Sequence, residues 1–491
     1  MLKSWLQSGL IAGLVLFMGS MGGSAWGAPL DDAIRQLNAH SSVAVTAEHA
    51  SYRAVFDAVI ELSEPPLPIG PSFNLTTIHA KMPEWSKVSA WAEANPKLAS
   101  AILAARDAVA TGMPYGVSAI ESKYRDAGLY VGLVGEEGRS TTNFAYLGAV
   151  DLVAAYATAE TYRLFEAGRT DDALRLSVAH LVLLRQFCDR QFTLEKKFAI
   201  RLLTEALGNL CDQMYVYLPT ITREQFYDLA WWEILSLRPE PGRLEMPEGD
   251  RVLAESILRS TFDADDQADT EKFAEVYGPI QARDEPLTRF GAVKRWAWIA
   301  TVHVSLEEAL HKLTTVYDDW WRRWRIKDND PVLDLPTAFD KTNAIRYGAV
   351  VLTLEDVESL FEIRNELIAA VNGTAMAAGL CGYVKVFEQY PPDVERVYAQ
   401  FCRKLSDSDP WHPGQLDVAY RPFKYRFVSS RHAVDTVYGR VWVEKNTGLL
   451  YARGTDREDN LAESHAFDGA QGDMVIWPPI KALAREQGLV P

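Results

Sequence analysis

The sequence predicts a mainly α-helical protein, an irregular array of helical hairpins, that ends in a small α+β domain. From about residue 30 to about residue 405, apolar residues recur at the helical spacing of three to four. After Pro410 the period changes to two, which is typical of strands. Hydrophobic residues make up 48% and charged residues 24% of the chain, the ordinary composition of a folded globular protein.

Residues 1–27 have the layout of a secretory signal peptide. Lys3 gives a positive start, Leu10 to Met18 forms an apolar stretch, and small residues from Ser24 to Ala28 predict cleavage after Gly27. The apolar stretch is short for a membrane span, and an uncleaved anchor is the alternative. We therefore expect a periplasmic or secreted protein with no stable membrane span after cleavage.

The mature chain divides into three parts: an N-terminal helical domain at 28–240, a second helical region at 250–350, and a long helix plus a small antiparallel β module at 354–491. A Pro- and Gly-rich stretch from Arg238 to Gly249 separates the first two parts. The expected helices cover residues 50–62, 83–109, 144–165, 171–187, 194–217, 223–237, 287–326 and 354–387.

The expected strands lie in the last quarter of the chain. Apolar and polar residues alternate in 425–428, 441–443 and 449–451. The run Lys445-Asn446-Thr447-Gly448 has turn chemistry, so we expect it to join the second and third strands as a hairpin.

The composition excludes some partners. The formal net charge is −16, whereas nucleic acids and anionic lipids bind basic surfaces. We therefore expect no nucleic acid partner. The charge fits a protein that collects divalent cations.

Four cysteines lie in a chain expected to reach an oxidising compartment. If the chain turns back at Pro391-Pro392, Cys381 and Cys402 lie at matching heights of a helical hairpin. Cys188 and Cys211 are separated along a helix by more than a disulfide spans. We expect a Cys381–Cys402 disulfide, if any pair is bonded.

Several motifs follow one another in the C-terminal part: Gln389-Tyr390-Pro391, Asp409-Pro410-Trp411 with Gly414, the run Tyr451 to Asp456, and Asp473. In this order they resemble the globular domain of the major pseudopilin of type II secretion. The resemblance implies a helix that ends at Tyr-Pro and a small antiparallel sheet with a calcium-binding loop. Two features depart from it. The family's apolar N-terminal helix is missing, and Glu388 stands where the family has Gly before Tyr-Pro. Residues 30–350 resemble the helical portions of uncharacterised exported bacterial proteins.

The resemblance implies a calcium site in the last acidic loop. Asp456 and Asp473 match the family's ligands best, and Asp459 matches as a third. Calcium takes six to eight oxygen ligands from carboxylates and carbonyls, and this loop also holds Glu463 and Asp468. The alternative is a solvated acidic loop without a bound ion.

The most unusual helical segment carries four aromatic residues, Tyr317, Trp320, Trp321 and Trp324. At helical spacing, Tyr317, Trp320 and Trp324 share one face. They form either a sugar- or protein-binding face or a helix anchored in the core, and the core is favoured because buried tryptophans outnumber binding ones.

No catalytic motif stands out in the sequence. We expect an exported, non-catalytic helical scaffold whose module assembles with protein partners in the cell envelope, in connection with secretion. The alternative is a carbohydrate-binding protein or a glycoside hydrolase that uses the Trp-rich helix and a pair of carboxylates, which carry no local sequence signature.

Overall fold

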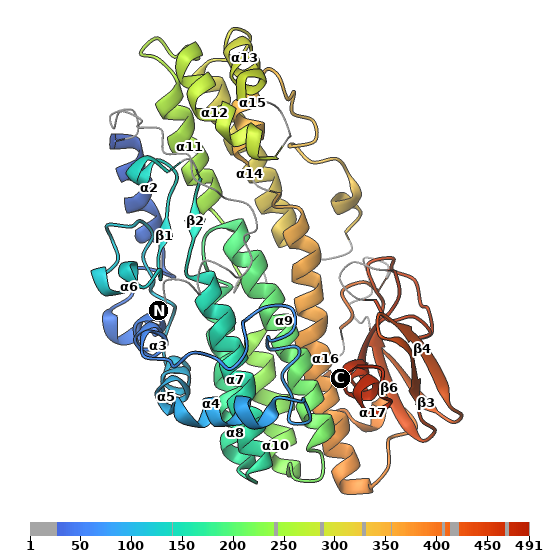
Figure 1. Ribbon diagram of the computed structural model, residues 1–491. Coiled ribbons are helices and arrows are strands. Elements are labelled where there is room, and N and C mark those ends of the chain that lie inside the picture. Colours follow the sequence, from blue (N-terminus) through green and yellow to red (C-terminus); the bar gives the residue numbers. More distant parts are fainter. Residues whose placement is uncertain are drawn as a thin grey trace.

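The computed structural model describes residues 27–490, except 140, 240–243, 285–288, 327–329, 355, 405–407, 413–421 and 467–470. The predicted signal peptide, residues 1–27, lies outside the described residues apart from Gly27, and so do Gly414 and Asp468. The protein is mostly helical, with small antiparallel sheets near its C-terminus, as the sequence predicts (Figure 1).

The first part of the chain contains α2 (Gly27–Asn38), α3 (Ser51–Ile60), α4 (Trp85–Ala94), α5 (Pro96–Ala105), α6 (Ser122–Asp126), α7 (Leu147–Glu166), α8 (Thr170–Phe187), α9 (Thr193–Val216), α10 (Arg223–Asp228) and α11 (Gly249–Thr261). The later helices are α12 (Thr270–Asp284), α13 (Arg289–Ala300), α14 (Leu306–Arg325), α15 (Gly348–Thr353), α16 (Ser359–Phe387) and α17 (Ile480–Glu486). Short 3-10 or π turns are η1 (Ala47–His49), η2 (Glu136–Gly138), η3 (Leu229–Glu233), η4 (Ile234–Leu237), η5 (Pro331–Asp334) and η6 (Val394–Arg396).

The helices predicted at 144–165 and 171–187 are confirmed as α7 and α8, which form a hairpin. Gly168 lies between them with a φ of 71°, a left-handed conformation that glycine adopts at little cost. The amide of Arg169 donates to the carbonyl of Leu164, which closes the end of α7.

Two helices predicted as continuous are broken. The 83–109 helix divides at Asn95, because the residue before a proline disfavours the helical conformation while Pro96 fits a first turn. The 287–326 helix divides into α13 and α14. Ser305 caps α14 by accepting a hydrogen bond from the amide of Glu308.

We call the described part of the chain before residue 422 the body. α16 is its central helix and runs through its whole lower half (Figure 1). Among the described residues it is the one helix long and apolar enough to cross a membrane. However, 89% of its most apolar 18-residue window is buried inside the protein. That burial is typical of a core helix.

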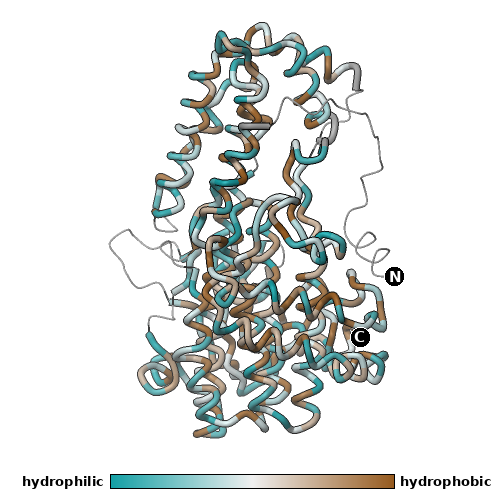
Figure 2. The backbone as a smooth tube through the Cα atoms, turned by 90° about the vertical axis from the view of Figure 1, so that its left-hand side faces the viewer, coloured by the Kyte–Doolittle hydropathy of each residue, from teal (hydrophilic) through white to brown (hydrophobic). Residues whose placement is uncertain are grey.

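One continuous hydrophobic core extends from Leu30 in α2 to Trp477 near the C-terminus. α2 packs against α11, so the two predicted helical regions share this core. Hydrophilic and hydrophobic residues alternate along the helices, the pattern of amphipathic helices around a common interior (Figure 2).

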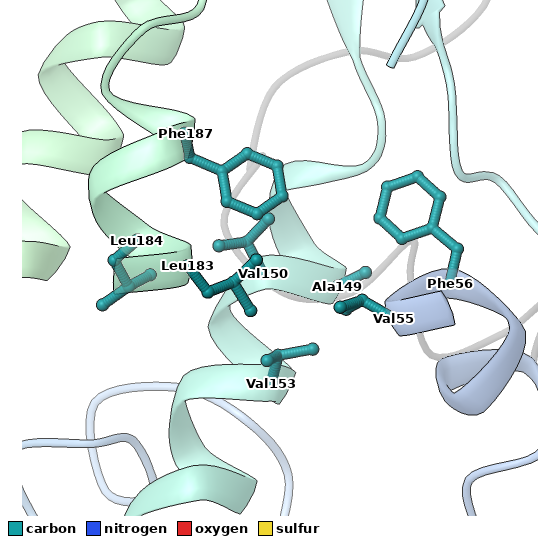
Figure 3. Close-up of a pocket in the computed structure, with 8 residues that line it drawn as sticks. All are labelled: Val55, Phe56, Ala149, Val150, Val153, Leu183, Leu184 and Phe187. Atoms are coloured by element: carbon teal, nitrogen blue, oxygen red, sulfur yellow. The ribbon is translucent and has the colours of Figure 1, made fainter. Parts of the chain in front are cut away.

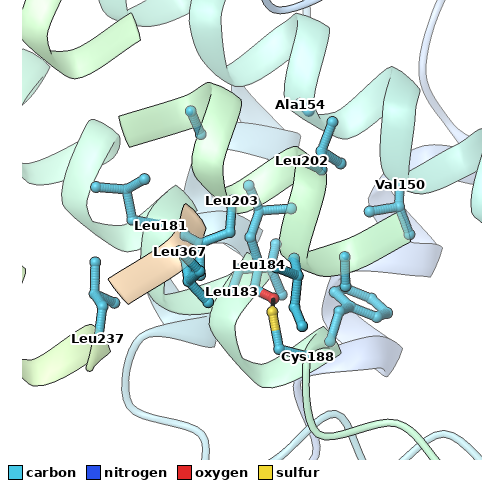
Figure 4. Close-up of a cluster of buried hydrophobic side chains, with 14 of the residues drawn as sticks. Val150, Ala154, Leu181, Leu183, Leu184, Cys188, Leu202, Leu203, Leu237 and Leu367 are labelled. Atoms are coloured by element: carbon cyan, nitrogen blue, oxygen red, sulfur yellow. Dashed lines mark hydrogen bonds between the residues drawn. The ribbon is translucent and has the colours of Figure 1, made fainter. Parts of the chain in front are cut away.

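The core is closely packed. A small apolar cavity of about 10 Å³ lies between α3, α7 and α8 and is lined by Val55, Phe56, Ala149, Val150, Val153, Leu183, Leu184 and Phe187 (Figure 3). In a neighbouring cluster, leucines of α8, α9, η4 and α16 surround Cys188, whose thiol donates to the carbonyl of Leu184 at 3.4 Å (Figure 4). The cavity is lined by apolar side chains alone, and the thiol of Cys188 is buried.

The C-terminal strands are β3 (Lys424–Val428), β4 (His432–Thr436), β5 (Gly439–Val443), β6 (Thr447–Ala452) and β7 (Met474–Trp477); the short strands β1 (Val131–Gly132) and β2 (Asn143–Phe144) lie in the body. β3, β6 and β7 form one antiparallel sheet in that order, and β4 pairs with β5. We call residues 422–490 the C-terminal module.

The predicted hairpin between 441–443 and 449–451 is wrong. β5 pairs with β4 through a turn in which Gly439 takes a φ of 102°, and β6 pairs with β3 instead. Residues 444–446 therefore lead from one sheet to the other, and Thr447 and Gly448 already belong to β6. The amide of Asn446 donates to the carbonyl of Val428 at 2.7 Å, which holds this crossing next to β3.

β6 joins the module to the body. Leu450 and Ala452 belong to the main core, whereas Leu449 and Tyr451 belong to a second core with the β4–β5 hairpin and α17. Alternate residues of a strand point to opposite faces, so one short strand serves both cores. The sheet thus packs on α16 with one face and encloses its own interior with the other.

Candidate functional site

The candidate site is a group of four carboxylates around the loop between β6 and β7, residues 453–473, which we call the acidic loop. Asp473 lies at its end, just before β7, and its side chain is fully buried. Its Oδ2 accepts a hydrogen bond from the amide of Ala462 at 2.7 Å. Its Oδ1 is buried without a hydrogen-bond partner. A buried carboxylate oxygen without a partner is costly, so this atom is the feature of the loop that calls for a ligand.

Asp456 organises the loop itself. Its Oδ1 accepts from the amide of Glu458 at 3.0 Å. Its Oδ2 accepts from the side-chain amide of Asn460 at 3.1 Å and from the amide of Gly472 at 3.2 Å. These bonds tie the two ends of the loop together across residues 456–472.

Asp459 forms an ion pair with Lys424 of β3. Its Oδ1 accepts from the hydroxyl of Tyr451 and from the amide of Leu461, both at 3.1 Å, and its Oδ2 lies 3.0 Å from Nζ of Lys424. Burial opposes ionisation, but the bonds from Lys424, Leu461 and Tyr451 outweigh it and hold the pKa of Asp459 below its usual value.

Asp409 completes the group from a different part of the chain. It is fully buried, and its two oxygens accept from the amides of Trp411 at 2.9 Å and Arg453 at 3.0 Å. The sequence signalled it only as part of the Asp-Pro-Trp motif. Asp409, Asp456, Asp459 and Asp473 are called the acidic cluster below.

The members of the acidic cluster influence one another electrostatically. Burial raises the pKa of Asp473 to about 6, and Asp459 and Asp456 raise it further. Burial likewise raises the pKa of Asp409 to about 6, with a contribution from Asp473. Two of the four acidic groups therefore resist ionisation.

The acidic cluster offers the kind of ligand atom that calcium prefers, since the side-chain atoms that could bind a metal ion are all carboxylate oxygens. Within the part of the chain that the structure describes, however, no three or more His, Cys, Asp or Glu side chains stand together as a formed metal site. The oxygens of Asp456 and Asp459 point to N–H and O–H donors instead. A bound cation would therefore have to exchange some of these hydrogen bonds for metal–oxygen contacts.

The Trp-rich helix is α14, and three of its four aromatic residues are buried. Tyr317, Trp320 and Trp324 are buried, and the indole N–H of Trp324 donates to the carbonyl of Leu244 at 2.8 Å. Trp321 is 41% exposed and lies under Arg325, whose Cζ is 3.6 Å from the ring centroid. The three residues on one face of the amphipathic helix are the ones that it turns to the core.

The structure does not contain the predicted Cys381–Cys402 disulfide, because all four cysteines are free and buried. Cys402 lies against Gly379, where an added Cβ would be 2.8 Å from that of Cys402. Residues two apart on a helix are about 200° apart around its axis, so Cys381 faces another way. Burial, and then its neighbour Cys211, raises the pKa of Cys381.

A second buried polar cluster lies at the turn between α8 and α9, and no motif in the sequence indicated it. The carboxylate of Glu195 accepts from the hydroxyls of Tyr115 at 2.9 Å and Tyr146 at 2.6 Å and from Nε of Arg190 at 3.0 Å. All four side chains are buried. They connect three segments of the body, and the charge of Glu195 is fully paired, whereas Nη2 of Arg190 is buried without a hydrogen-bond partner.

Comparison of this chain with protein-family models, with curated proteins and with solved structures gives no match. The resemblance to a pseudopilin domain therefore stays a prediction that depends on the motifs.

Proposed function

We propose that this chain is an exported, non-catalytic helical scaffold whose pseudopilin-like C-terminal module binds calcium and assembles with protein partners in the cell envelope. The observation that carries the calcium part is the Oδ1 atom of Asp473, which is buried and has no hydrogen-bond partner. The carboxylates of Asp459 and Asp456 are near enough to act on Asp473 electrostatically. A bound calcium ion would take Asp473, Asp456 and Asp459 as carboxylate ligands and would supply the charge compensation that this atom lacks.

The scaffold part is supported by how the module is attached. β6 contributes to both the main core and the core of the module, and α17 is tied to α9 by an ion pair in which Nη1 of Arg485 lies 2.9 Å from Asp212. The module is thus held against α16 and α9 by shared packing and by this ion pair. A part that is held in place in this way suits the presentation of a surface to a partner.

The carbohydrate alternative has less support. It requires two or more tryptophans and two carboxylates around one cleft. Trp320 and Trp324 are in the core, and the indole N–H of Trp320 is bonded to Glu358 at 3.2 Å. An open depression of about 230 Å³ on α14 is lined by Glu307, Glu308, His311 and Tyr347 and has no tryptophan.

Thermal melting with calcium or with a chelator tests the calcium part. We expect millimolar CaCl2 to raise Tm of the full chain relative to EDTA. Asp473→Asn should abolish that shift without lowering Tm in EDTA, because it removes a buried charge but keeps the shape. Asp435→Asn is the matched control, since Asp435 is an exposed carboxylate of the same module. A wild-type Tm that calcium does not move would overturn the proposal.

Site-specific photo-crosslinking in envelope fractions tests the assembly part. Probes at Leu461 and Val437 lie on exposed positions of the module, and a probe at Val109 lies on an exposed position of the body. We expect an adduct from the module positions that is lost when Asp473→Asn is introduced. Adducts from Val109 alone would contradict a partner-binding module.

A further inference from the structure

Lys424 is placed by the sheet so that its ammonium group reaches the acidic cluster. It is the first residue of β3 and lies opposite Tyr451 in the β3–β6 register. Its Nζ lies 3.0 Å from Oδ2 of Asp459, while the hydroxyl of the opposite residue, Tyr451, donates to Oδ1 of the same carboxylate. The two residues of this cross-strand pair thus contact both oxygens of Asp459. The strand register determines where the ammonium group of Lys424 lies.

The charge balance of the cluster gives this contact its importance. Among the described residues, Lys424 forms a salt bridge with the acidic cluster, through Asp459. Asp473 nearby has a fully buried carboxylate whose Oδ1 lacks a partner. Arg457 of the same loop points away, toward Asp334, at 3.5 Å. Lys424 is therefore the basic side chain that pairs directly with Asp459, while the guanidinium of Arg453 acts on Asp409.

We propose that the ammonium of Lys424 is a built-in competitor of the divalent cation, so that calcium binding displaces Lys424 from Asp459; this inference rests on the calcium site proposed above. The ion pair is partly exposed, with 36% of the Lys424 side chain and 25% of the Asp459 side chain accessible, so it opens at low cost. A carboxylate cannot keep a close ammonium and also bind calcium without the two positive charges repelling each other.

The competition sets the calcium affinity and makes it a property of β3 as well as of the acidic loop. With the cation absent, Lys424 holds the loop against the sheet. With calcium bound, the Lys424 side chain is released to solvent at the start of β3. In the acidic loop, the calcium ion then replaces the ammonium group of Lys424 at Asp459, and the loop keeps its compact shape.

Calorimetric titration of CaCl2 into the full chain at low salt tests the competition. We expect Lys424→Met to lower Kd about tenfold, the order expected when one unit charge is removed beside a ligand. Lys424→Arg keeps the charge and should bind like the wild type. Lys445→Met is the matched control, since Lys445 is an exposed lysine of the same module before β6.

The outcomes separate the two proposals. Wild type and Lys424→Met that bind calcium with equal Kd would overturn the role of Lys424 and leave the calcium site standing. Binding by neither protein would overturn the calcium site and this inference with it. Binding by Lys424→Met alone would support the competition most strongly.

A second measurement needs no substitution. Acylation of lysine amines in the wild-type protein, followed by peptide mass spectrometry, reports how accessible Lys424 is. We expect its modification to increase several-fold when CaCl2 replaces EDTA, while that of Lys445 stays constant. Unchanged modification of Lys424 in a protein that binds calcium would overturn the displacement.

Discussion

Gly373 of α16 and Ile476 of β7 lie so close that a Cβ atom on Gly373 would be 2.4 Å from Cδ1 of Ile476. This contact lets the sheet of the C-terminal module approach the central helix. The isoleucine occupies the space that any larger residue at position 373 would need.

Gly373→Ala should therefore destabilise the protein. Helix propensity favours alanine by up to about 1 kcal/mol, but overpacking of the sheet against α16 costs about 1–3 kcal/mol and outweighs it. Gly208→Ala is the control, because Gly208 lies in α9 with nothing within 4 Å of an added Cβ. Urea unfolding of both variants checks this. A Gly373→Ala protein as stable as Gly208→Ala would contradict the close packing.

The ion pair between Asp212 and Arg485 should be important for the attachment of α17. Both side chains are almost completely buried, with exposed fractions of 5% and 12%. Removal of one partner of a buried pair leaves the other charge uncompensated and costs about 3–5 kcal/mol. We expect Asp212→Asn to lower the free energy of unfolding by an amount in this range.

The exposed pair of Asp435 and Arg440 is the control for that experiment, since both side chains are more than half accessible. Asp435→Asn should leave the urea midpoint unchanged, because water screens such pairs. Equal midpoints for Asp212→Asn and the wild type would mean that α17 does not depend on this pair.

The stability of the protein should decrease in acid partly because of His180. Burial lowers the pKa of His180 to about 4, whereas an exposed histidine in the unfolded chain titrates near 6.5. Between about pH 6.5 and pH 4 the unfolded state binds more protons, so the free energy of unfolding falls as pH falls through this window, by at most about 3 kcal/mol. The contribution is fully present above pH 6.5.

His180→Leu should make this pH dependence shallower. His465, whose pKa burial also lowers to about 4, keeps part of the slope. Urea unfolding at pH 7.5, 6 and 5 measures the effect. The same loss of stability between pH 7.5 and 5 in wild type and variant would show that His180 is not responsible.

The four cysteines should be free and unreactive in the folded protein. All are buried, and burial raises the pKa of the Cys188 and Cys211 thiols to about 12, so little reactive thiolate forms. We expect no reaction with a thiol reagent under native conditions and four modified cysteines in urea. A Cys381–Cys402 linked peptide in a digest of the exported protein would contradict the structure.

Much of the secondary structure followed from the sequence alone. The helical hairpin of α7 and α8, the long apolar helix α16 and the three strands at 425–428, 441–443 and 449–451 agree with their periodicity. The local signals that would have corrected the errors were also present. Asn95-Pro96 and the cap Ser305 with Glu308 mark the breaks in the two helices predicted as continuous.

The acidic loop was visible in the sequence as a group of carboxylates, but its internal arrangement was not. Asp409 joins it from more than forty residues earlier, and Lys424 reaches it from β3. Neither could be assigned from spacing, because side chains far apart in the chain meet only through the sheet register.

The sequence by itself determined where most of the long helices and three of the strands lie, since periodicity and capping act over a few neighbouring residues. The tertiary structure decided which strand pairs with which, that the face of α14 with Trp320 and Trp324 is buried, and which way Cys381 points. Those outcomes depend on contacts between residues distant in the chain. Their free energy comes from burying one surface against another, and a local pattern does not say which surface that will be.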